Sequence, residues 1–259
     1  MNEHVKGYTG KQLRVKLNEG VVETEKTPMD WVEDYWGGVG FAAKLLYEEL
    51  PPNVDPLGPR NKIVFSTGPL TMNKVPGGGS LSVCFKSPLT GGWGESRAGG
   101  DFGPEMRRAG YDHIIIEGRS DTPVVLVVDN DKTELRSGDD LVGKTVSEKK
   151  KVLVEGLGLS GYQLLTIGPG GENRVRFATV MIDDRAAGRG GGGAVLGSKN
   201  LLAVAVKGSG RVAEADSAGF IESIRQAMDV VRKHPNSEGF QAAGTIGDLP
   251  GNDDGGDWP

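Results

Sequence analysis

Glycine is the residue that most limits how this chain can fold. The 259 residues include 42 glycines, against about 18 expected at the average frequency of roughly 7%. No three-residue period runs through them, which excludes a collagen-like chain. Because glycine gives up side-chain packing and costs backbone entropy on folding, this surplus indicates a backbone that approaches something closely at many places.

The charge balance and the termini exclude several classes of protein. There are 30 Lys and Arg residues and 35 Asp and Glu residues, a net charge of −5, which argues against a nucleic-acid binder. No apolar run reaches the ~18 residues of a membrane span, and the N-terminus has no signal-peptide pattern. We therefore expect a cytoplasmic protein with neither nucleic acid nor membrane as a partner. Its single cysteine, Cys84, excludes an intrachain disulfide framework or a cluster of cysteine ligands.

Short apolar runs alternate with stretches of helical spacing. We expect strands at 14–25 (a pair), 62–67, 80–85, 113–117, 123–128, 163–167, 175–181 and 201–206. We expect helices within 31–50 and at 104–109, 146–155 and 217–233. Asp216 is the expected N-cap of the last helix. This mixture predicts an α+β fold.

Two parts of the chain follow one pattern. The strands that end at Gly68-Pro69 and at Gly168-Pro169 are each followed by a strand, an arginine-containing glycine-rich loop, a short helix and a strand ending in glycine. The pattern indicates a weak internal duplication; a chance likeness between such units is the alternative. If the duplication is real, the two loops could face one another across one ligand or a pair of like ligands.

The segment 183–194, DDRAAGRGGGGA, carries the strongest local signal. Arg185 and Arg189 stand four apart, just ahead of a glycine run at an expected helix start. Backbone N–H groups at a helix start, with guanidinium groups beside them, form an anion site suited to phosphate or pyrophosphate. A flexible surface loop is the alternative.

The glycine-rich loops at 77–79 and 91–100 are a second candidate. Their backbone could lie against a flat heterocycle, with Arg97 meeting its anionic group. The alternative is a set of tight turns in a small β domain.

Other chemical signals are weak. Gly156, Gly158 and Gly161 match a dinucleotide-binding pattern but follow a helix and precede a strand, the reverse of the required order, so we interpret them as a helix end and a turn. Cys84 and His113 lie in apolar strands, and we expect both to be buried and structural. The chain therefore has no catalytic residues that we can name, and it is expected to hold a cofactor.

At these loops the sequence resembles the tungsten-containing aldehyde ferredoxin oxidoreductase family, in its N-terminal domain only. The motifs follow the family's order over nearly the whole chain, and the last is highly specific. They are GPLT at 68–71, KSPLTG at 86–91, AGGDFG at 98–103 with AGYD at 109–112, IGPGGEN at 167–173, and RAAGRGGGGAVLGSKN at 185–200.

The resemblance implies a two-lobed α+β fold over residues 1–210, an internally duplicated β-sheet domain with short helices. Each half would cover one of two pyranopterin-dithiolates that ligate a single tungsten, or molybdenum. A magnesium ion would bridge the two pterin phosphates, held by the backbone carbonyls of Arg97 and Ala186. The cofactor-binding residues implied are Ser80, Arg97, Gly99, Arg185, Ala186, Gly188 and Arg189. Two of them depart from the family: Ser80 stands where an arginine is expected and Arg97 where an asparagine is expected. Contacts in the first half are therefore expected to be rearranged, with Arg97 supplying positive charge.

In the family, an aldehyde is oxidised to a carboxylate, and electrons pass through a four-iron, four-sulfur cluster to ferredoxin. That cluster is held by cysteines of later domains, so the enzyme is expected to be incomplete in this chain. We expect residues 211–259 to be the truncated start of a following helical domain, whose remainder comes from missing C-terminal domains or a partner subunit. The alternatives are a non-catalytic pterin- or phosphate-binding module and a generic nucleotide binder.

Overall fold

The computed structural model describes residues 5–71, 75–244 and 247, and the chain divides into two compact units, residues 1–215 and 216–259. The second unit contains helices α7 (Ser217–Lys233) and α8 (Ser237–Ala243). The Asp216 carboxylate accepts a hydrogen bond from the Gly219 amide at 3.0 Å, which confirms the predicted N-cap. None of the described helices has the length and apolar character needed to cross a bilayer.

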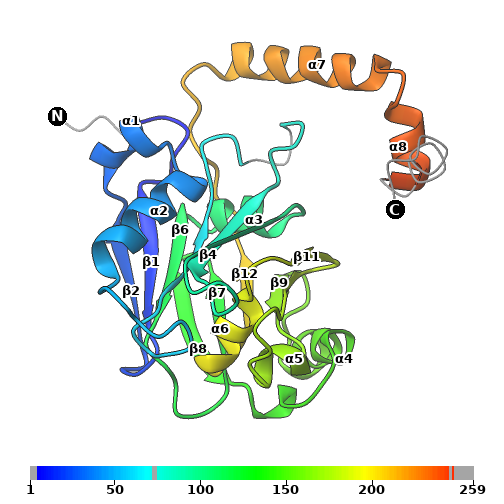
Figure 1. Cartoon of the computed structure of the whole chain (residues 1–259). Coiled ribbons are helices and arrows are strands. Elements are labelled where there is room, and N and C mark those ends of the chain that lie inside the picture. The colour runs from blue at the N-terminus through cyan, green and yellow to red at the C-terminus, as the bar shows by residue number, and fades with distance from the viewer. Residues whose placement is uncertain (1–4, 72–74, 245–246, 248–259) are drawn as a thin grey trace. The chain divides into compact units, whose positions relative to one another are not determined.

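The first unit is built on two six-stranded mixed sheets (Figure 1). The strands of the first sheet are β1 (Lys11–Lys16), β2 (Val21–Lys26), β3 (Ile63–Ser66), β4 (Leu81–Lys86), β5 (Trp93–Ala98) and β6 (His113–Glu117). Those of the second sheet are β7 (Val124–Asp129), β8 (Lys132–Ser137), β9 (Gln163–Thr166), β10 (Val180–Ile182), β11 (Arg185–Ala187) and β12 (Leu201–Lys207).

The two sheets share one topology. The first has the order β2-β1-β6-β3-β4-β5, and the second, read from its β8 edge, has the order β8-β7-β12-β9-β10-β11. Each strand of the second sheet thus takes the place of the strand six before it. The pairs β1–β6 and β7–β12 are parallel, and all other neighbours are antiparallel. The predicted two-lobed, internally duplicated α+β fold is confirmed.

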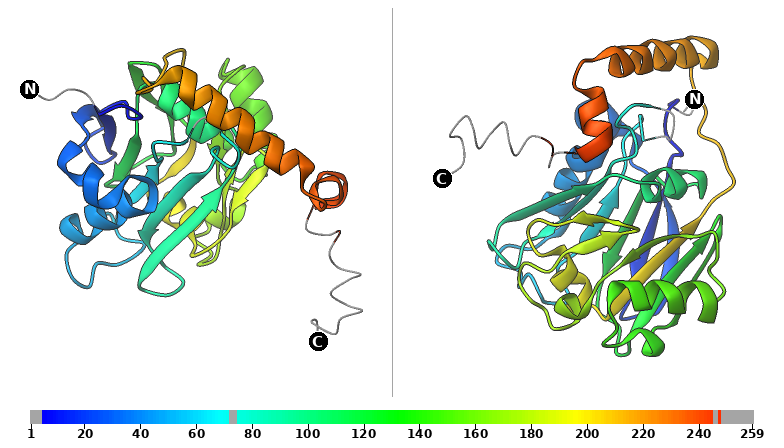
Figure 2. Two further views of the ribbon diagram at one scale, coloured as in Figure 1. Left: turned by 90° about the horizontal axis from the view of Figure 1, so that it is seen from above. Right: turned by 90° about the vertical axis from the view of Figure 1, so that its right-hand side faces the viewer.

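Short helices connect and cover the sheets. They are α1 (Val32–Tyr35), α2 (Gly38–Glu49), α3 (Phe102–Arg108), α4 (Val146–Lys151) with a π-helical turn over Val152–Gly156, α5 (Pro169–Glu172) and α6 (Gly192–Ser198). Helix α2 packs Phe41, Ala42 and Leu45 against Val64, Cys84 and Ile115 on the outer face of the first sheet. Helix α4 packs near β9 of the second sheet (Figure 2).

The inner faces of both sheets form one apolar core. One short helix from each half packs against strands of the other half. Helix α3 of the first half packs against β9 and β12, whereas α6 of the second half packs against β3 and β4 as well as β12. Glycine makes the close approach of α6 possible: a Cβ on Gly192 would lie 2.8 Å from Phe85 Cε1, and one on Gly193 would overlap the Thr179 carbonyl oxygen. Part of the glycine surplus therefore serves contacts within the protein.

Three strands were not expected from the sequence, and a fourth has other bounds than expected. The glycine-rich segments at 93–98 and 185–187 are β5 and β11, and β8 had no counterpart among the expected strands. All three lie at sheet edges, where polar residues and glycine are tolerated because one side of the strand is not paired within its sheet. The strand expected at 175–181 is only β10, since 175–178 form a turn closed by the Ala178 amide and the Val175 carbonyl.

Candidate functional site

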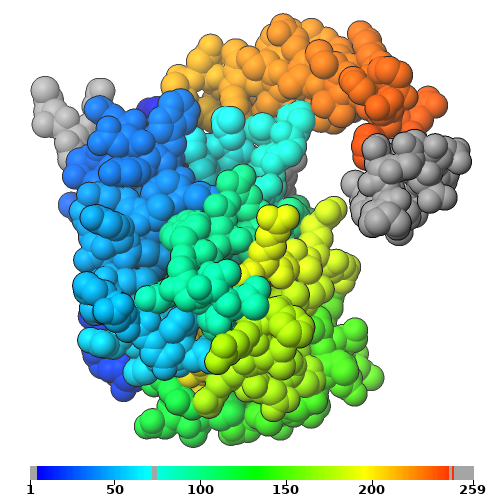
Figure 3. Space-filling view, viewed as in Figure 1, coloured from blue at the N-terminus to red at the C-terminus, as the bar shows by residue number. Residues whose placement is uncertain are grey.

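The edge strands of the two sheets, β5 and β11, lie against each other. The Arg189 amide, just after β11, donates a hydrogen bond to Ser96 Oγ on β5 at 3.0 Å. Ser87 Oγ, at the hairpin that precedes β5, donates to the Gly190 carbonyl at 2.7 Å. The two glycine-rich segments therefore face one another, as expected if the duplication is real. In Figure 3 the green surface near residue 95 and the yellow-green surface of the second half adjoin on the face shown.

A cavity of about 640 Å³ lies between these edges; we call it the cradle. Its lining residues are Trp93, Glu95, Ser96, Arg97, Ala186, Gly188 and Arg189. This volume is within the roughly 300–1,000 Å³ typical of small-molecule sites. Four of the seven predicted cofactor-binding residues are thus brought together from both halves.

The cradle inherits the repeat of the fold. Both β5 and β11 end in a buried alanine, Ala98 at 5% and Ala187 at 1% exposure. Arg97 precedes the first of these alanines and Ala186 precedes the second, and both line the cavity. Arg97 and Ala186 thus occupy equivalent positions of the two halves.

The arginines of the cradle differ in their partners. Arg97 Nε lies 2.8 Å from Glu95 Oε1 on the same strand, and its side chain is 61% exposed. Arg185 and Arg189 are exposed, and within the described parts of the chain neither forms an ion pair. A guanidinium without a carboxylate keeps its charge available for an anion, so the second half offers two such guanidinium groups.

Gly99 contacts protein in this structure. A Cβ on Gly99 would lie 3.7 Å from Arg185 Cδ, and one on Gly100 would lie at the same distance. The Arg185 side chain therefore crosses from the second half to lie over the first. Gly99 and Arg185 are adjacent to each other, beside the cradle residues and outside the set that lines the cavity.

Ser80 is not brought into the cradle. It is exposed, its hydroxyl lies 3.5 Å from the Gly77 carbonyl oxygen, and it is absent from the cavity lining. The loop that ends at Ser80 instead packs on the first half, where a Cβ on Gly79 would lie 2.7 Å from the Gly100 carbonyl oxygen.

The helix start after Arg189 differs from the expectation. Helix α6 begins at Gly192, but every residue of it is buried. The Gly193 amide donates to the Ala178 carbonyl and the Ala194 amide donates to the Gly191 carbonyl. These N–H groups are used inside the fold, because the glycine run allows α6 to pack directly against neighbouring backbone.

Trp93, Glu95 and Ser96 belong to the cradle but were not among the predicted site residues. The signal was present: WGESRA alternates between exposed or half-exposed and buried positions along β5, as an edge strand does. Its run of three polar residues, 95–97, and its glycine made it resemble a loop.

Cys84 and His113 are buried, as predicted. Burial raises the pKa of the Cys84 thiol to about 12, which leaves it protonated and inert at neutral pH. Burial also lowers the pKa of His113, whose ring stacks on Phe41 at 3.6 Å while Nδ1 lies 2.7 Å from Ser66 Oγ. Gly158 and Gly161, which match the dinucleotide-binding pattern, lie in turns after the π-helical segment, with φ of 69° and 81°. Among the described residues no three His, Cys, Asp or Glu side chains group as metal ligands.

Comparison with known proteins gives one consistent result. A family model described as "Aldehyde ferredoxin oxidoreductase, N-terminal domain" matches residues 12–208. A tungsten-containing aldehyde ferredoxin oxidoreductase of Pyrococcus horikoshii is 45% identical over 234 residues, which is 90% of this chain and 39% of that protein. The aliphatic sulfonate oxidoreductase, WOR-like subunit, of Pyrococcus furiosus is 39% identical over 80% of this chain and 35% of its own length.

Among solved structures, the active-site complex BamBC of benzoyl coenzyme A reductase, with 1,5-dienoyl-CoA, superposes with a TM-score of 0.85 at 36% identity. The match covers 88% of this chain and 35% of the matched one. The chain therefore spans about two fifths of the length of the curated oxidoreductases that it matches.

Proposed function

Because this chain belongs to the aldehyde ferredoxin oxidoreductase family, as its N-terminal domain, we propose that the cradle binds the phosphate ends of two pyranopterin cofactors that carry tungsten or molybdenum. The observation that carries the proposal is the pairing of equivalent edges, Arg97-Ala98-Gly99 and Ala186-Ala187-Gly188, around one cavity. A ligand with two like anionic arms fits a site built from two like strands.

The residues present fit such a group. Arg189 lines the cavity and Arg185 lies over Gly99 at its edge, so two guanidinium groups would neutralise phosphate. Arg97 would add a third cation where the family has an asparagine, and the carbonyls of Arg97 and Ala186 would hold magnesium between the phosphates. Ser80 and Gly99 would contribute only through the loops that flank Arg185.

When bound, the metal centre supplies the two-electron oxidation of an aldehyde to a carboxylate. The residues of this chain bind and orient the cofactor, offset its negative charge, and shield it from water with the Trp93 wall of the cradle. Ferredoxin as the electron acceptor, and an iron–sulfur cluster in further domains, complete the proposed cytoplasmic enzyme.

We assign residues 1–210 to the cofactor-binding domain and 211–259 to the start of a helical domain. The division of the structure supports this assignment, since α7 and α8 belong to a compact unit of their own, residues 216–259.

The test is elemental and pterin analysis of the 259-residue chain, purified from a host that makes the cofactor. Tungsten or molybdenum with released pterin and without iron is expected. Metal and pterin with no aldehyde oxidation after the remaining domains are supplied would favour the non-catalytic binding module. The proposal fails if neither metal nor pterin is found in the chain or in its complex with those domains.

A further inference from the structure

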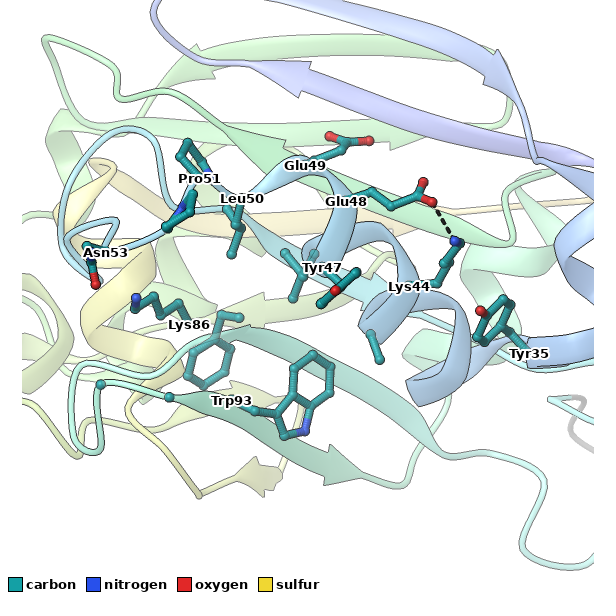
Figure 4. Close-up of a pocket in the computed structure, with 16 residues that line it drawn as sticks. Tyr35, Lys44, Tyr47, Glu48, Glu49, Leu50, Pro51, Asn53, Lys86 and Trp93 are labelled. Atoms are coloured by element: carbon teal, nitrogen blue, oxygen red, sulfur yellow. Dashed lines mark ion pairs between the residues drawn. The ribbon is translucent and has the colours of Figure 1, made fainter.

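A second hollow, of about 1120 Å³, lies between helix α2 and the β4–β5 hairpin, and we call it the α2 groove (Figure 4). Its walls are the C-terminal half of α2, the loop 50–53 that follows, and the hairpin residues 85–86 and 91–93. Trp93 lines both the groove and the cradle. The volume is slightly above the roughly 300–1,000 Å³ typical of small-molecule sites.

Aromatic side chains give the groove its apolar character. Tyr35, Tyr47, Phe85 and Trp93 all line it. Tyr47 is 87% exposed and Trp93 is 45% exposed, and Figure 4 shows them on opposite walls, from α2 and from the hairpin. Exposed rings on two sides of one hollow offer faces and edges against which a planar aromatic ligand can stack.

Most charges that line the groove are already paired. Lys44 forms an ion pair with Glu48 one turn along α2. Glu49 accepts from Arg14 at 2.9 Å and from Lys62 at 2.6 Å. Burial acts to raise the pKa of Glu49, but the hydrogen bonds from Arg14 and Lys62 outweigh it and lower the pKa. Neither carboxylate therefore attracts a cation into the groove.

Lys86 is the exception. Its backbone is fixed at the end of β4, where the amide donates to Asn61 Oδ1 at 3.3 Å and the carbonyl accepts from Asn61 Nδ2 at 3.0 Å. Its side chain extends along the groove toward Asn53 (Figure 4). Within the described ranges no carboxylate lies within ion-pair distance of its ammonium group. One unpaired, half-buried cation thus stands among exposed aromatic rings.

We propose that the α2 groove is a binding site for a planar aromatic carboxylate, with Lys86 pairing with the carboxylate and Trp93 and Tyr47 contacting the ring. The charge pattern selects the ligand class: an apolar neutral ligand would leave Lys86 uncompensated, and a dianion would meet only one free cation. The groove adjoins the cradle at Trp93, but its cation, Lys86, is not part of the cradle, and the proposal does not depend on what the cradle binds.

The test uses benzoate as the probe, neutral benzamide as its uncharged counterpart and acetate as the ring-free control. Binding to the whole chain is followed by the indole N–H resonance of Trp93 and by calorimetry. We expect a saturable shift of that resonance with benzoate, binding about fivefold weaker with benzamide, and no shift with acetate.

Matched variants separate the groove from other sites. Lys86→Met should weaken benzoate about fivefold and leave benzamide unchanged. Lys44→Met, which removes a lysine already paired with Glu48, should leave benzoate within about twofold. Thermal unfolding of each variant confirms that it is folded.

Three outcomes would overturn the proposal. Benzamide binding as tightly as benzoate would show that the carboxylate charge of the ligand contributes nothing to binding. Lys86→Met affecting both ligands equally would place the carboxylate elsewhere. A Trp93 shift that depends on protein concentration and not on benzoate would identify a second copy of the chain as the occupant.

Discussion

The two halves of the first unit share a strand plan and differ in charge where they meet. In the first half β5 is six residues long, and its Arg97 is paired with Glu95 on the same strand. In the second half β11 is three residues long, and Arg185 and Arg189 form no ion pair in the described part of the chain. The backbone repeats, but the first half largely offsets its own cation whereas the second leaves two available.

A second difference concerns the buried cation near each short helix. Arg107 in α3 lies 3.4 Å from Asp112 and donates to carbonyls of its own half, at Gly7 and Gly68. Lys199, just after α6, donates instead to carbonyls of the other half: Asn61 at 2.5 Å, Gly118 at 2.9 Å and Pro59 at 3.4 Å. The buried cation of the first half therefore bonds within its own half, whereas that of the second half bonds to the other half.

The largest expected effect is on the free energy of unfolding, and it comes from substitutions at the second residue of α3 and of α6. Gly193→Ala would place a Cβ into the Thr179 carbonyl oxygen, whereas Gly103→Ala would meet Thr71 Cγ2 at 3.1 Å. We expect Gly193→Ala to lower the free energy of unfolding by about 3 kcal/mol and Gly103→Ala by about 1 kcal/mol. Urea unfolding of the two variants measures this. Equal losses would show that the halves pack their helices with the same tolerance.

The next effect is on anion binding, with inorganic pyrophosphate as the probe. Removing both free cations with Arg185→Ala and Arg189→Ala should weaken binding about 100-fold, since each charge-assisted contact is worth about tenfold. Arg97→Ala should weaken it less than about threefold, because that side chain is exposed and already paired. Calorimetry at fixed ionic strength makes the comparison. A larger loss for Arg97→Ala would show that the first half, and not the second, makes the main contacts with the anion.

The buried ammonium group of Lys199 predicts a pH dependence of the free energy of unfolding. Burial lowers the pKa of Lys199 from 10.5 to about 7, although Glu117 acts to raise it and Lys62 to lower it further. A lysine whose pKa is lower in the folded state binds fewer protons there, so the free energy of unfolding should rise with pH from about 7 to about 10.5. The slope for one such group approaches about 1.4 kcal/mol per pH unit.

The control for this prediction is Lys199→Met. In that variant the slope should flatten across the same pH window, while other titrating groups keep their contribution. Chemical unfolding at a series of pH values measures both proteins. An unchanged slope would assign the titration to another group.

The smallest expected effect would make the first half more like the second. Glu95→Gln removes the carboxylate that holds Arg97 at 2.8 Å and should raise pyrophosphate affinity about two- to threefold. The matched control is Glu134→Gln. Glu134 pairs with Arg136 on β8, a strand that does not line the cradle. A rise in both variants would indicate a general charge effect.

Much of this arrangement could be predicted from the sequence, for a physical reason. The central strands, such as β6 and β12, are continuous apolar runs because both of their faces are buried. The Gly-Pro ends and the following loop and helix then revealed the repeat. Edge strands β5, β8 and β11 escaped prediction because they are polar or glycine-rich, and apolar periodicity is the signal on which strand prediction depends.

The site was predicted in part, for a related reason. Arg97, Ala186, Gly188 and Arg189 meet in the cradle, but no local pattern could show that Arg185 would cover Gly99, or that α6 would bury its own amides. Those features depend on which sheet each short helix packs against. Sequence periodicity indicates that a face is buried, but it does not identify the partner.

The exchange of helices between the halves also determines when the first sheet can complete its packing during translation. Strands β3 and β4 are covered by α6, which follows them by more than 100 residues along the chain. At a synthesis rate of about 5–20 residues per second, α6 is made at least several seconds after β3 and β4. The inner face of the first sheet is uncovered until then. During this interval the nascent first half exposes apolar strands, and it is the stage at which a chaperone would engage the chain.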